Sequence, residues 1–251
     1  MITVFTCGHD FTSMLTCIYD AWSSRLGHNN VRLCVEPVDQ LNMFETYIHV
    51  EPNEAKASEV VRAVNEKISP YFYGELMYCA GAYEPDTLNT IYRVMVLGFK
   101  YGSQVLKMYQ FPDVTRFLEI SKRYGGEAHS FREFARFHLV GNIYVAHIEP
   151  KSHVLLPVAE YFIDRCPSES WIVVDDVHRE AVVHPLNSPY YLKSLTDDEF
   201  ERLLLTENAN DEFTSLWQSY FDNIAIQARI NYRCQLNHFP KWKRKHAVEF
   251  V

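Results

Sequence analysis

The dipeptide Gly141-Asn142 is the feature that most constrains the fold of this chain. It separates two segments, 127–139 and 143–149, in which polar and apolar residues alternate. A Gly-Asn pair between two such segments is typical of a type II′ turn, so we predict an antiparallel hairpin. The cross-strand pairs that follow from this turn are Val140 with Ile143, His138 with Val145, Arg136 with His147 and Phe134 with Glu149.

Alternation sorts the hairpin side chains onto two faces of a sheet. One face is apolar and is predicted to face the core: Phe131, Ala135, Phe137, Leu139, Tyr144, Ala146 and Ile148. The other is largely polar: Arg132, Phe134, Arg136, His138, Val145, His147 and Glu149. Its guanidinium groups suit a phosphate, and its imidazoles and carboxylate suit general acid–base work. A solvated face of an antiparallel sheet shows the same pattern, so both interpretations stay open.

Three residues of this region are candidates for catalysis: His129, His147 and Glu149. His129 lies two residues from Glu127 at the start of the predicted strand, and a metal ligand or a hydrogen-bonded structural histidine are the alternatives there. We predict no metal site and no cofactor. The histidines lack the i, i+4 spacing of a helical metal site, and the scattered cysteines form no C-x-x-C pair.

The rest of the chain predicts an α+β fold, with antiparallel hairpins packed against helices. Strands are predicted at 2–6, 31–36, 46–50, 171–175 and 180–184, and helices at 10–23, after Pro52, 85–99, 112–124 and 154–164. Gly125-Gly126 is predicted to end the fourth helix, and Thr196 with Glu199 forms a capping box before another. We place an N-terminal α/β subdomain at 1–105 and a C-terminal α+β subdomain at 106–251, and a single domain is the alternative.

The last forty residues combine a long amphipathic helix with a basic tail. From Asn210 onward, apolar residues recur with helical spacing, which predicts one buried face: Phe213, Leu216, Trp217, Tyr220, Phe221, Ile224, Ala225 and Ala228. The segment 229–246 contains no acid, although the whole chain carries a net charge of −8. Nucleic acid is therefore a candidate partner of the tail, and docking of the tail on the acidic body is the alternative.

The tail and the polar hairpin face together supply the residues that we predict to bind nucleic acid: Arg132, Arg136, Arg229, Arg233, Lys241, Trp242, Lys243, Arg244 and Lys245. Trp242 is expected either to pack or to stack on a base. No apolar run is long enough to span a bilayer, and the N-terminus lacks signal-peptide character, so we expect a cytoplasmic protein without membrane contact. No nucleotide-binding or metalloprotease motif occurs.

Several segments resemble an uncharacterised family described as "probable DNA metabolism protein". The similar blocks are Phe11–Tyr19, Glu127–Arg132 with Arg136-Phe137, Ala146–Pro150, Trp171–Asp175, and an ending that includes Leu216-Trp217, Ile224–Ile226, Arg229, Asn231, Gln235 and Pro240-Lys241. The family ending usually reads Met-Pro-Lys-Arg-Tyr-Trp, whereas the aromatic residue is shifted here to Trp242. The resemblance spans nearly the whole chain.

The resemblance implies an association with DNA repair or modification. Similar proteins are linked with a radical-SAM protein, and a similar domain is fused to uracil-DNA-glycosylase-like proteins. We therefore expect a DNA-associated protein that works with a radical-SAM partner, and we leave catalysis open. The alternatives are a metal-independent, glycosylase-like enzyme and a protein-interaction module without DNA contact.

Overall fold

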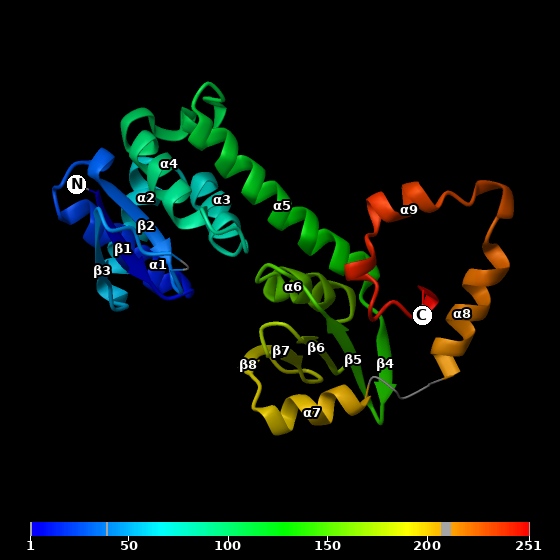
Figure 1. The fold of residues 1–251 in the computed structure, drawn as a ribbon. Coiled ribbons are helices and arrows are strands. Elements are labelled where there is room, and N and C mark those ends of the chain that lie inside the picture. The colour runs from blue at the N-terminus through cyan, green and yellow to red at the C-terminus, as the bar shows by residue number, and fades with distance from the viewer. Residues whose placement is uncertain (1, 39, 207–211, 251) are drawn as a thin grey trace. The chain divides into compact units, whose positions relative to one another are not determined.

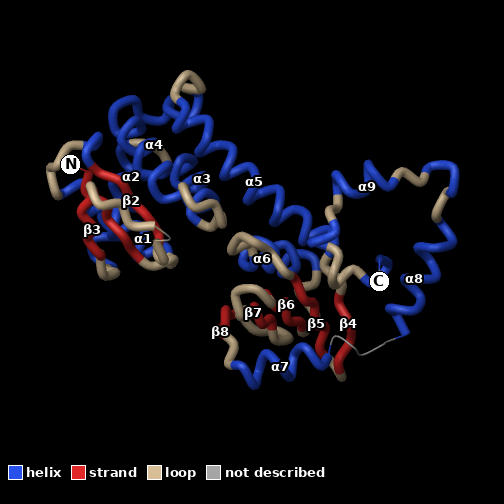
Figure 2. Tube along the Cα trace, viewed as in Figure 1, coloured by secondary structure: helices blue, strands red, loops and turns tan. Residues whose placement is uncertain are grey.

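The computed structural model describes residues 2–38, 40–206 and 212–250. Its chain contacts divide it into two compact units, residues 1–125 and 126–251. Helix α5 (Pro112–Phe134) contributes residues to both units (Figure 1). The predicted α+β class is confirmed (Figure 2). The predicted division into subdomains at 105/106, with a single domain as the alternative, stays a prediction.

The N-terminal unit is built on a parallel sheet of strand order β2-β1-β3. The strands are β1 (Ile2–Cys7), β2 (Val31–Val35) and β3 (Glu45–His49), which confirms the three predicted strands. The helices of this unit before α5 are α1 (Phe11–Ser23), α2 (Glu54–Lys67), α3 (Pro70–Ala80) and α4 (Thr87–Tyr101). Residues from β1, β2 and all these helices share one buried apolar core.

Side-chain caps determine where several of these helices begin. The Asp10 carboxylate accepts a hydrogen bond from the Ser13 backbone N–H at 2.9 Å, and Ser69 Oγ accepts one from the Phe72 backbone N–H at 3.1 Å. Helix α3, which Ser69 caps, was missing from the sequence prediction. Apolar and aromatic residues occupy most positions of this helix, so the sequence shows no separate apolar and polar faces. The Ser69-Pro70 pair, with Pro at the first helical position, was nevertheless a signal for a helix start.

Helix α5 corrects the predicted stop at Gly125-Gly126. It continues through both glycines to Phe134, so the predicted strand from Glu127 was wrong. Neither glycine has a positive φ, and two helical glycines cost about 1 kcal/mol each relative to alanine. The helix persists because its buried stripe runs through the glycines: Val114, Phe117, Ile120, Tyr124, Ala128 and Phe131.

The C-terminal unit is built on a five-stranded sheet of order β4-β5-β6-β7-β8 (Figure 1). The strands are β4 (Phe137–Val140), β5 (Ile143–Ile148), β6 (Trp171–Asp175), β7 (Glu180–His184) and β8 (Tyr191–Ser194). Strand β8 was not predicted. Strands β5 and β6 are parallel and are joined by helix α6 (Leu155–Arg165), whereas the other neighbours are antiparallel. The carboxyl ends of β5 and β6 therefore meet at one edge.

The predicted hairpin is confirmed for β4 and β5. His138 pairs with Val145 and Val140 with Ile143, and Gly141 has the positive φ of +62° that a type II′ turn requires at its first central residue. The pairing begins only at Phe137, so Arg136 with His147 and Phe134 with Glu149 were wrong pairs.

Both faces of this sheet are covered, which corrects the solvated-face interpretation. Helix α6 packs on β6 and β7, while Phe200 of helix α7 (Asp197–Thr206) joins Val145 and Val174 in a cluster on the other face. The predicted capping box of α7 is confirmed, because the Glu199 carboxylate accepts a hydrogen bond from the Thr196 backbone N–H at 3.2 Å and Thr196 Oγ1 accepts one from the Glu199 N–H. The strand residues of the predicted polar face, His138, Val145 and His147, are therefore buried.

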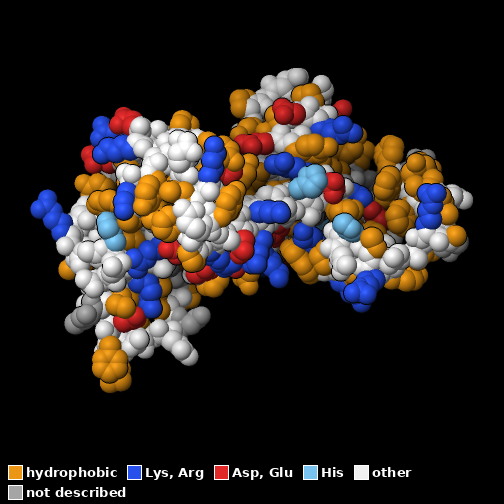
Figure 3. All heavy atoms as spheres, turned by 90° about the horizontal axis from the view of Figure 1, so that it is seen from above, with side chains coloured by type: hydrophobic (Ala, Val, Ile, Leu, Met, Phe, Trp, Pro, Cys, Tyr) orange, Lys and Arg blue, Asp and Glu red, His pale blue; other side chains and the backbone are white. Residues whose placement is uncertain are grey.

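The chain ends with helices α8 (Glu212–Ile224) and α9 (Tyr232–His238) and a segment of short turns. The predicted start at Asn210 lies outside the described residues. A buried face on α8 was a wrong expectation, since much of its apolar stripe is exposed: Phe213, Leu216, Trp217, Tyr220 and Ile224. In Figure 3 apolar side chains and cations intermingle over this C-terminal region. In the described part of the chain, no helix combines the length and apolar character needed to cross a membrane.

Candidate functional site

Polar side chains gather where the parallel strands β5 and β6 end. His147 is the penultimate residue of β5 and Glu149 follows that strand, while Asp175 ends β6 and Asp176 follows it. Alternation turns His147, Glu149 and Asp176 to the same side of the sheet. The edge beyond the carboxyl ends of parallel strands is the usual place for ligands in such sheets.

The pair His147–Asp176 forms the buried centre of this group. His147 Nδ1 lies 2.8 Å from Asp176 Oδ1, and the two side chains are 0% and 4% exposed. His147 Nε2 is buried and makes no hydrogen bond. An imidazole held through Nδ1 by a buried aspartate, with Nε2 left for a substrate, is the arrangement of a general acid–base histidine.

The pKa of Asp176 lies below its ordinary value. Burial acts to raise it, but the interactions with His147 and His246 favour the carboxylate and outweigh burial. Asp176 is therefore ionised at neutral pH, and it stabilises positive charge on either imidazole.

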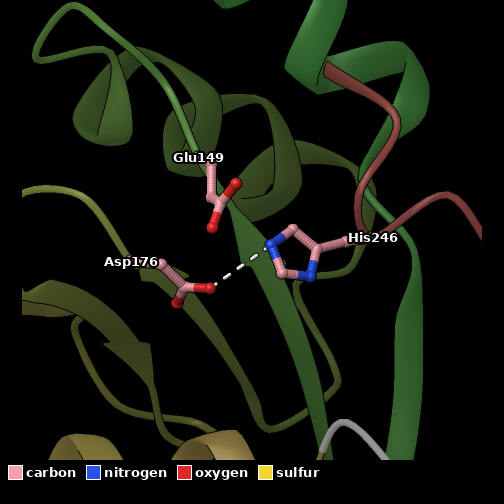
Figure 4. A group of neighbouring side chains, drawn as sticks. All are labelled: Glu149, Asp176 and His246. Atoms are coloured by element: carbon pink, nitrogen blue, oxygen red, sulfur yellow. Dashed lines mark ion pairs between the residues drawn. The ribbon is translucent and has the colours of Figure 1, made fainter. Parts of the chain in front are cut away.

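His246 and Glu149 complete the group. His246 Nε2 lies 3.3 Å from Asp176 Oδ2, and the ring of His246 is centred 5.7 Å from that of His147. One potential ligand atom from each of Glu149, Asp176 and His246 lies within 4.8 Å of the other two. Figure 4 shows these three side chains directed toward one another, Glu149 and Asp176 from the strand ends and His246 from the C-terminal segment.

The turn after β6 is fixed by Asp175, the neighbour of Asp176. Its Oδ1 accepts hydrogen bonds from the backbone N–H groups of Val177 and His178, both at 3.0 Å, and its Oδ2 lies 2.7 Å from His178 Nδ1. The His178 ring also contacts the His153 ring, with centroids 3.8 Å apart and the planes tilted by 32°. These contacts hold the backbone that presents Asp176.

The pKa of His178 is raised above 6.5. Burial acts to lower it, but the hydrogen bond and the charge of Asp175 outweigh burial. A group with a raised pKa in the folded state stabilises the fold fully below its unfolded pKa and loses this contribution as the pH rises through the folded pKa. We therefore expect His178→Ala to lower the free energy of unfolding more at about pH 5.5 than at about pH 9.

Urea unfolding at a series of pH values, followed by circular dichroism, measures this difference. His129→Ala is the matched control, because His129 is exposed and pairs with the exposed Glu133 on its own helix. A cost of His178→Ala that grows with pH would contradict the assigned direction of the shift.

The structure brings together two of the three predicted catalytic residues. His147 and Glu149 lie in the site, whereas His129 lies on α5, with Nε2 3.2 Å from Glu133 Oε1. The sequence missed Asp176 and His246. The acidic pair that ends β6 was a usable signal for Asp176, but nothing in the spacing links His246 to it.

Many of the predicted phosphate-binding cations have partners within the C-terminal unit. Arg136 pairs with Glu249, Lys245 with Glu149, and Lys243 Nζ donates to Ser130 Oγ at 2.8 Å. Burial lowers the pKa of Lys243.

Arg132 and Arg244 donate instead to backbone carbonyls, those of Pro157 and Phe239, at 3.0 and 2.7 Å. Trp242 packs edge-on against Phe131, with Lys151 4.9 Å above its ring. Contacts within the C-terminal unit thus engage five of the eight predicted cations: Arg132, Arg136, Lys243, Arg244 and Lys245. Among the residues that the structure describes, Arg229, Arg233 and Lys241 show no ion pair.

Residues 85–249 match the family model described as a domain of unknown function, DUF4130. The match contains every residue of the site described above. Comparison with curated proteins gave no match.

Proposed function

The chain belongs to the DUF4130 family, and we propose that it is a cytoplasmic, DNA-associated protein of repair or modification whose C-terminal unit performs acid–base chemistry. The buried His147–Asp176 pair is the observation on which this proposal depends. Burying an ionised aspartate destabilises the fold, and the second imidazole nitrogen, Nε2, makes no hydrogen bond. Such an arrangement is typical of a residue pair that transfers protons. The association with DNA rests on the family resemblance and on the remaining open cations.

The proposed roles follow from the geometry. His147 exchanges a proton with a substrate or with an attacking water through Nε2, and Asp176 orients the ring and stabilises its protonated form. Glu149 and His246 lie beside Asp176 (Figure 4).

The proposed DNA surface consists of Arg229, Arg233 and Lys241. All three are exposed, and they belong to or border the short helices that follow α8. Three cations make a modest phosphate contact, which suits a protein with a net charge of −8 that engages DNA briefly.

We assign the exposed stripe of α8 to a protein partner. Leu216 and Tyr220 are 59% and 56% exposed, one turn apart on the helix, and an apolar stripe of this kind is typical of a helix that docks on another protein. The family resemblance suggests that this partner is a radical-SAM protein.

The test is a fluorescence-anisotropy titration of single- and double-stranded DNA at two salt concentrations. We expect Arg229→Glu/Arg233→Glu/Lys241→Glu to abolish salt-sensitive binding, because each phosphate contact contributes about 0.7–0.9 to the slope of log affinity against log salt. In the same experiment, Leu216→Asp/Tyr220→Asp should bind DNA normally but no longer co-elute with a purified radical-SAM protein.

The matched control reverses three exposed cations of the N-terminal unit, Arg62→Glu/Lys100→Glu/Lys122→Glu, and so changes the net charge equally. Equal losses in both triple variants would show that only net charge matters and would remove the proposed DNA surface. Absence of DNA binding by the wild type, with co-elution retained, would favour the interaction module without DNA contact.

A further inference from the structure

We infer that Glu149, Asp176 and His246 bind a divalent transition-metal ion, for which Zn²⁺ is the fitting example. The three residues come from two strand ends and from the C-terminal segment, and their ligand atoms lie within 4.8 Å of one another. Two ligands bound to the same ion at about 2.0–2.2 Å are separated by less than this distance, so small side-chain movements bring the donors to one ion. The sequence predicted no metal because these donors are far apart along the chain.

Asp176 gives independent support for a ligand at this point. Its side chain is 4% exposed, and its buried Oδ2 has an ion pair with His246 but no well-aligned hydrogen bond. This oxygen faces His246 Nε2 at 3.3 Å, and Figure 4 shows it directed into the space between the three residues. A buried carboxylate oxygen normally has hydrogen-bond donors, so its environment here is one that a cation would complete.

His147 acts as a positioning residue for this ligand. Its Nδ1 lies 2.8 Å from Asp176 Oδ1, which leaves Oδ2 as the oxygen that faces the site. Ligating carboxylates are commonly held through their second oxygen in this way, and loss of such a partner lowers metal affinity by about 10- to 100-fold.

The donor set selects the kind of ion. One imidazole and two carboxylates suit Zn²⁺ or a neighbouring transition metal, whereas Mg²⁺ and Ca²⁺ prefer oxygen donors alone. Three protein ligands also leave a coordination position for water, as in catalytic rather than structural zinc sites. Only this catalytic consequence rests on the proposed function, because the binding itself follows from the donors.

Lys245 and the metal ion would compete for the carboxylate of Glu149. The Lys245 ammonium group contacts Glu149 Oε1, and the lysine side chain is 57% exposed, so it can swing into solvent when Glu149 turns to a metal. His246 must also be neutral to bind, which makes the affinity fall at acid pH. Lys245→Ala is therefore expected to bind Zn²⁺ at least as tightly as the wild type.

Isothermal titration of the full chain with Zn²⁺, and separately with Mg²⁺, tests the inference. We expect one Zn²⁺ per chain with a Kd of about 1 µM or below, and negligible heat with Mg²⁺. His246→Ala and Asp176→Asn should each weaken Zn²⁺ binding by more than about 100-fold, and His147→Gln by about 10- to 100-fold. His129→Ala, which alters an exposed histidine on α5, should bind as the wild type does.

Cobalt absorption distinguishes this site from binding at cysteine, since a cobalt–thiolate bond gives an intense near-ultraviolet charge-transfer band that N and O ligands lack. The exposed Cys234 is replaced by Ser as a second control. Failure of the wild type to bind Zn²⁺, equal binding by His246→Ala, or a thiolate band lost with Cys234 would each overturn the inference. None of these outcomes depends on DNA binding or turnover, so they are separate from a failure of the proposed function.

Discussion

Asp176→Asn is expected to lower the rate of DNA processing by about 100- to 10,000-fold while leaving DNA affinity unchanged. The substitution keeps the size of the side chain but removes the charge that orients His147 and stabilises its protonated ring. It also reverses the hydrogen-bonding preference at one oxygen, because an amide nitrogen donates where the carboxylate accepted. The chemistry should fail although the fold and the DNA surface remain.

The measurement is release of bases and scission of strands from labelled oligonucleotides that carry deaminated or alkylated bases. Circular dichroism confirms folding of each variant, and anisotropy confirms its DNA binding. His129→Ala provides the matched control, since its imidazole is exposed on α5 and lies outside the group formed by His147, Glu149, Asp176 and His246. Turnover by Asp176→Asn within about threefold of the wild type would exclude His147–Asp176 as the acid–base pair, since such a pair contributes at least about 100-fold. Wild type that leaves every substrate unchanged would remove the catalytic part of the proposal.

The local features of this fold were accessible from the sequence because each depends on neighbouring residues. The turn at Gly141-Asn142 fixed the register of β4 and β5, and the capping box of Thr196 and Glu199 located the start of α7. The failure at Gly125-Gly126 has the opposite origin. A cost of about 1 kcal/mol for each helical glycine is small beside the burial of the apolar stripe that continues through α5, and that burial depends on tertiary packing.

The candidate site was only half accessible for a related reason. His147 and Glu149 share a strand, so alternation alone places them on one face. Their meeting with Asp176 depends on β6 lying parallel beside β5, which the crossover through α6 produces. His246 reaches the same point from the C-terminal segment, and no sequence periodicity or motif predicts that this segment folds back onto the sheet.

The C-terminal segment that contains His246 is anchored by an ion pair between Arg136 and Glu249. We expect a large loss of stability when this pair is broken. The two side chains are 20% and 2% exposed, and the guanidinium donates through Nε and Nη2 to both carboxylate oxygens, with the Nε contact at 3.1 Å. Arg136→Ala leaves the Glu249 carboxylate buried without its cation, and breaking a buried pair in this way costs about 3–5 kcal/mol.

The C-terminal segment can avoid part of this cost by detaching, so the measured loss of stability is limited by the free energy that docks the segment. In the docked segment the Ala247 N–H donates to the Arg244 carbonyl and the Phe250 N–H donates to the Ala247 carbonyl, each at 2.9 Å. These short local turns lose their support when the segment detaches, and their hydrogen bonds then open. We therefore expect amide hydrogen exchange in residues 244–250 of Arg136→Ala to accelerate sharply, while exchange in β5 and β6 changes little.

Adding Glu249→Gln to the Arg136→Ala variant tests whether the uncompensated charge of Glu249 causes the detachment. The neutral amide can be buried without a cation, so the double variant should regain much of the protection that Arg136→Ala loses. If it does not, Arg136 acts on the segment by a route other than the charge pair, such as its packing over the Trp217 ring of α8, 5.1 Å away. Because His246 belongs to the detached segment, Arg136→Ala should weaken Zn²⁺ binding in parallel with the loss of exchange protection. Unaltered Zn²⁺ affinity in a variant whose segment exchanges freely would show that His246 is dispensable for the ion.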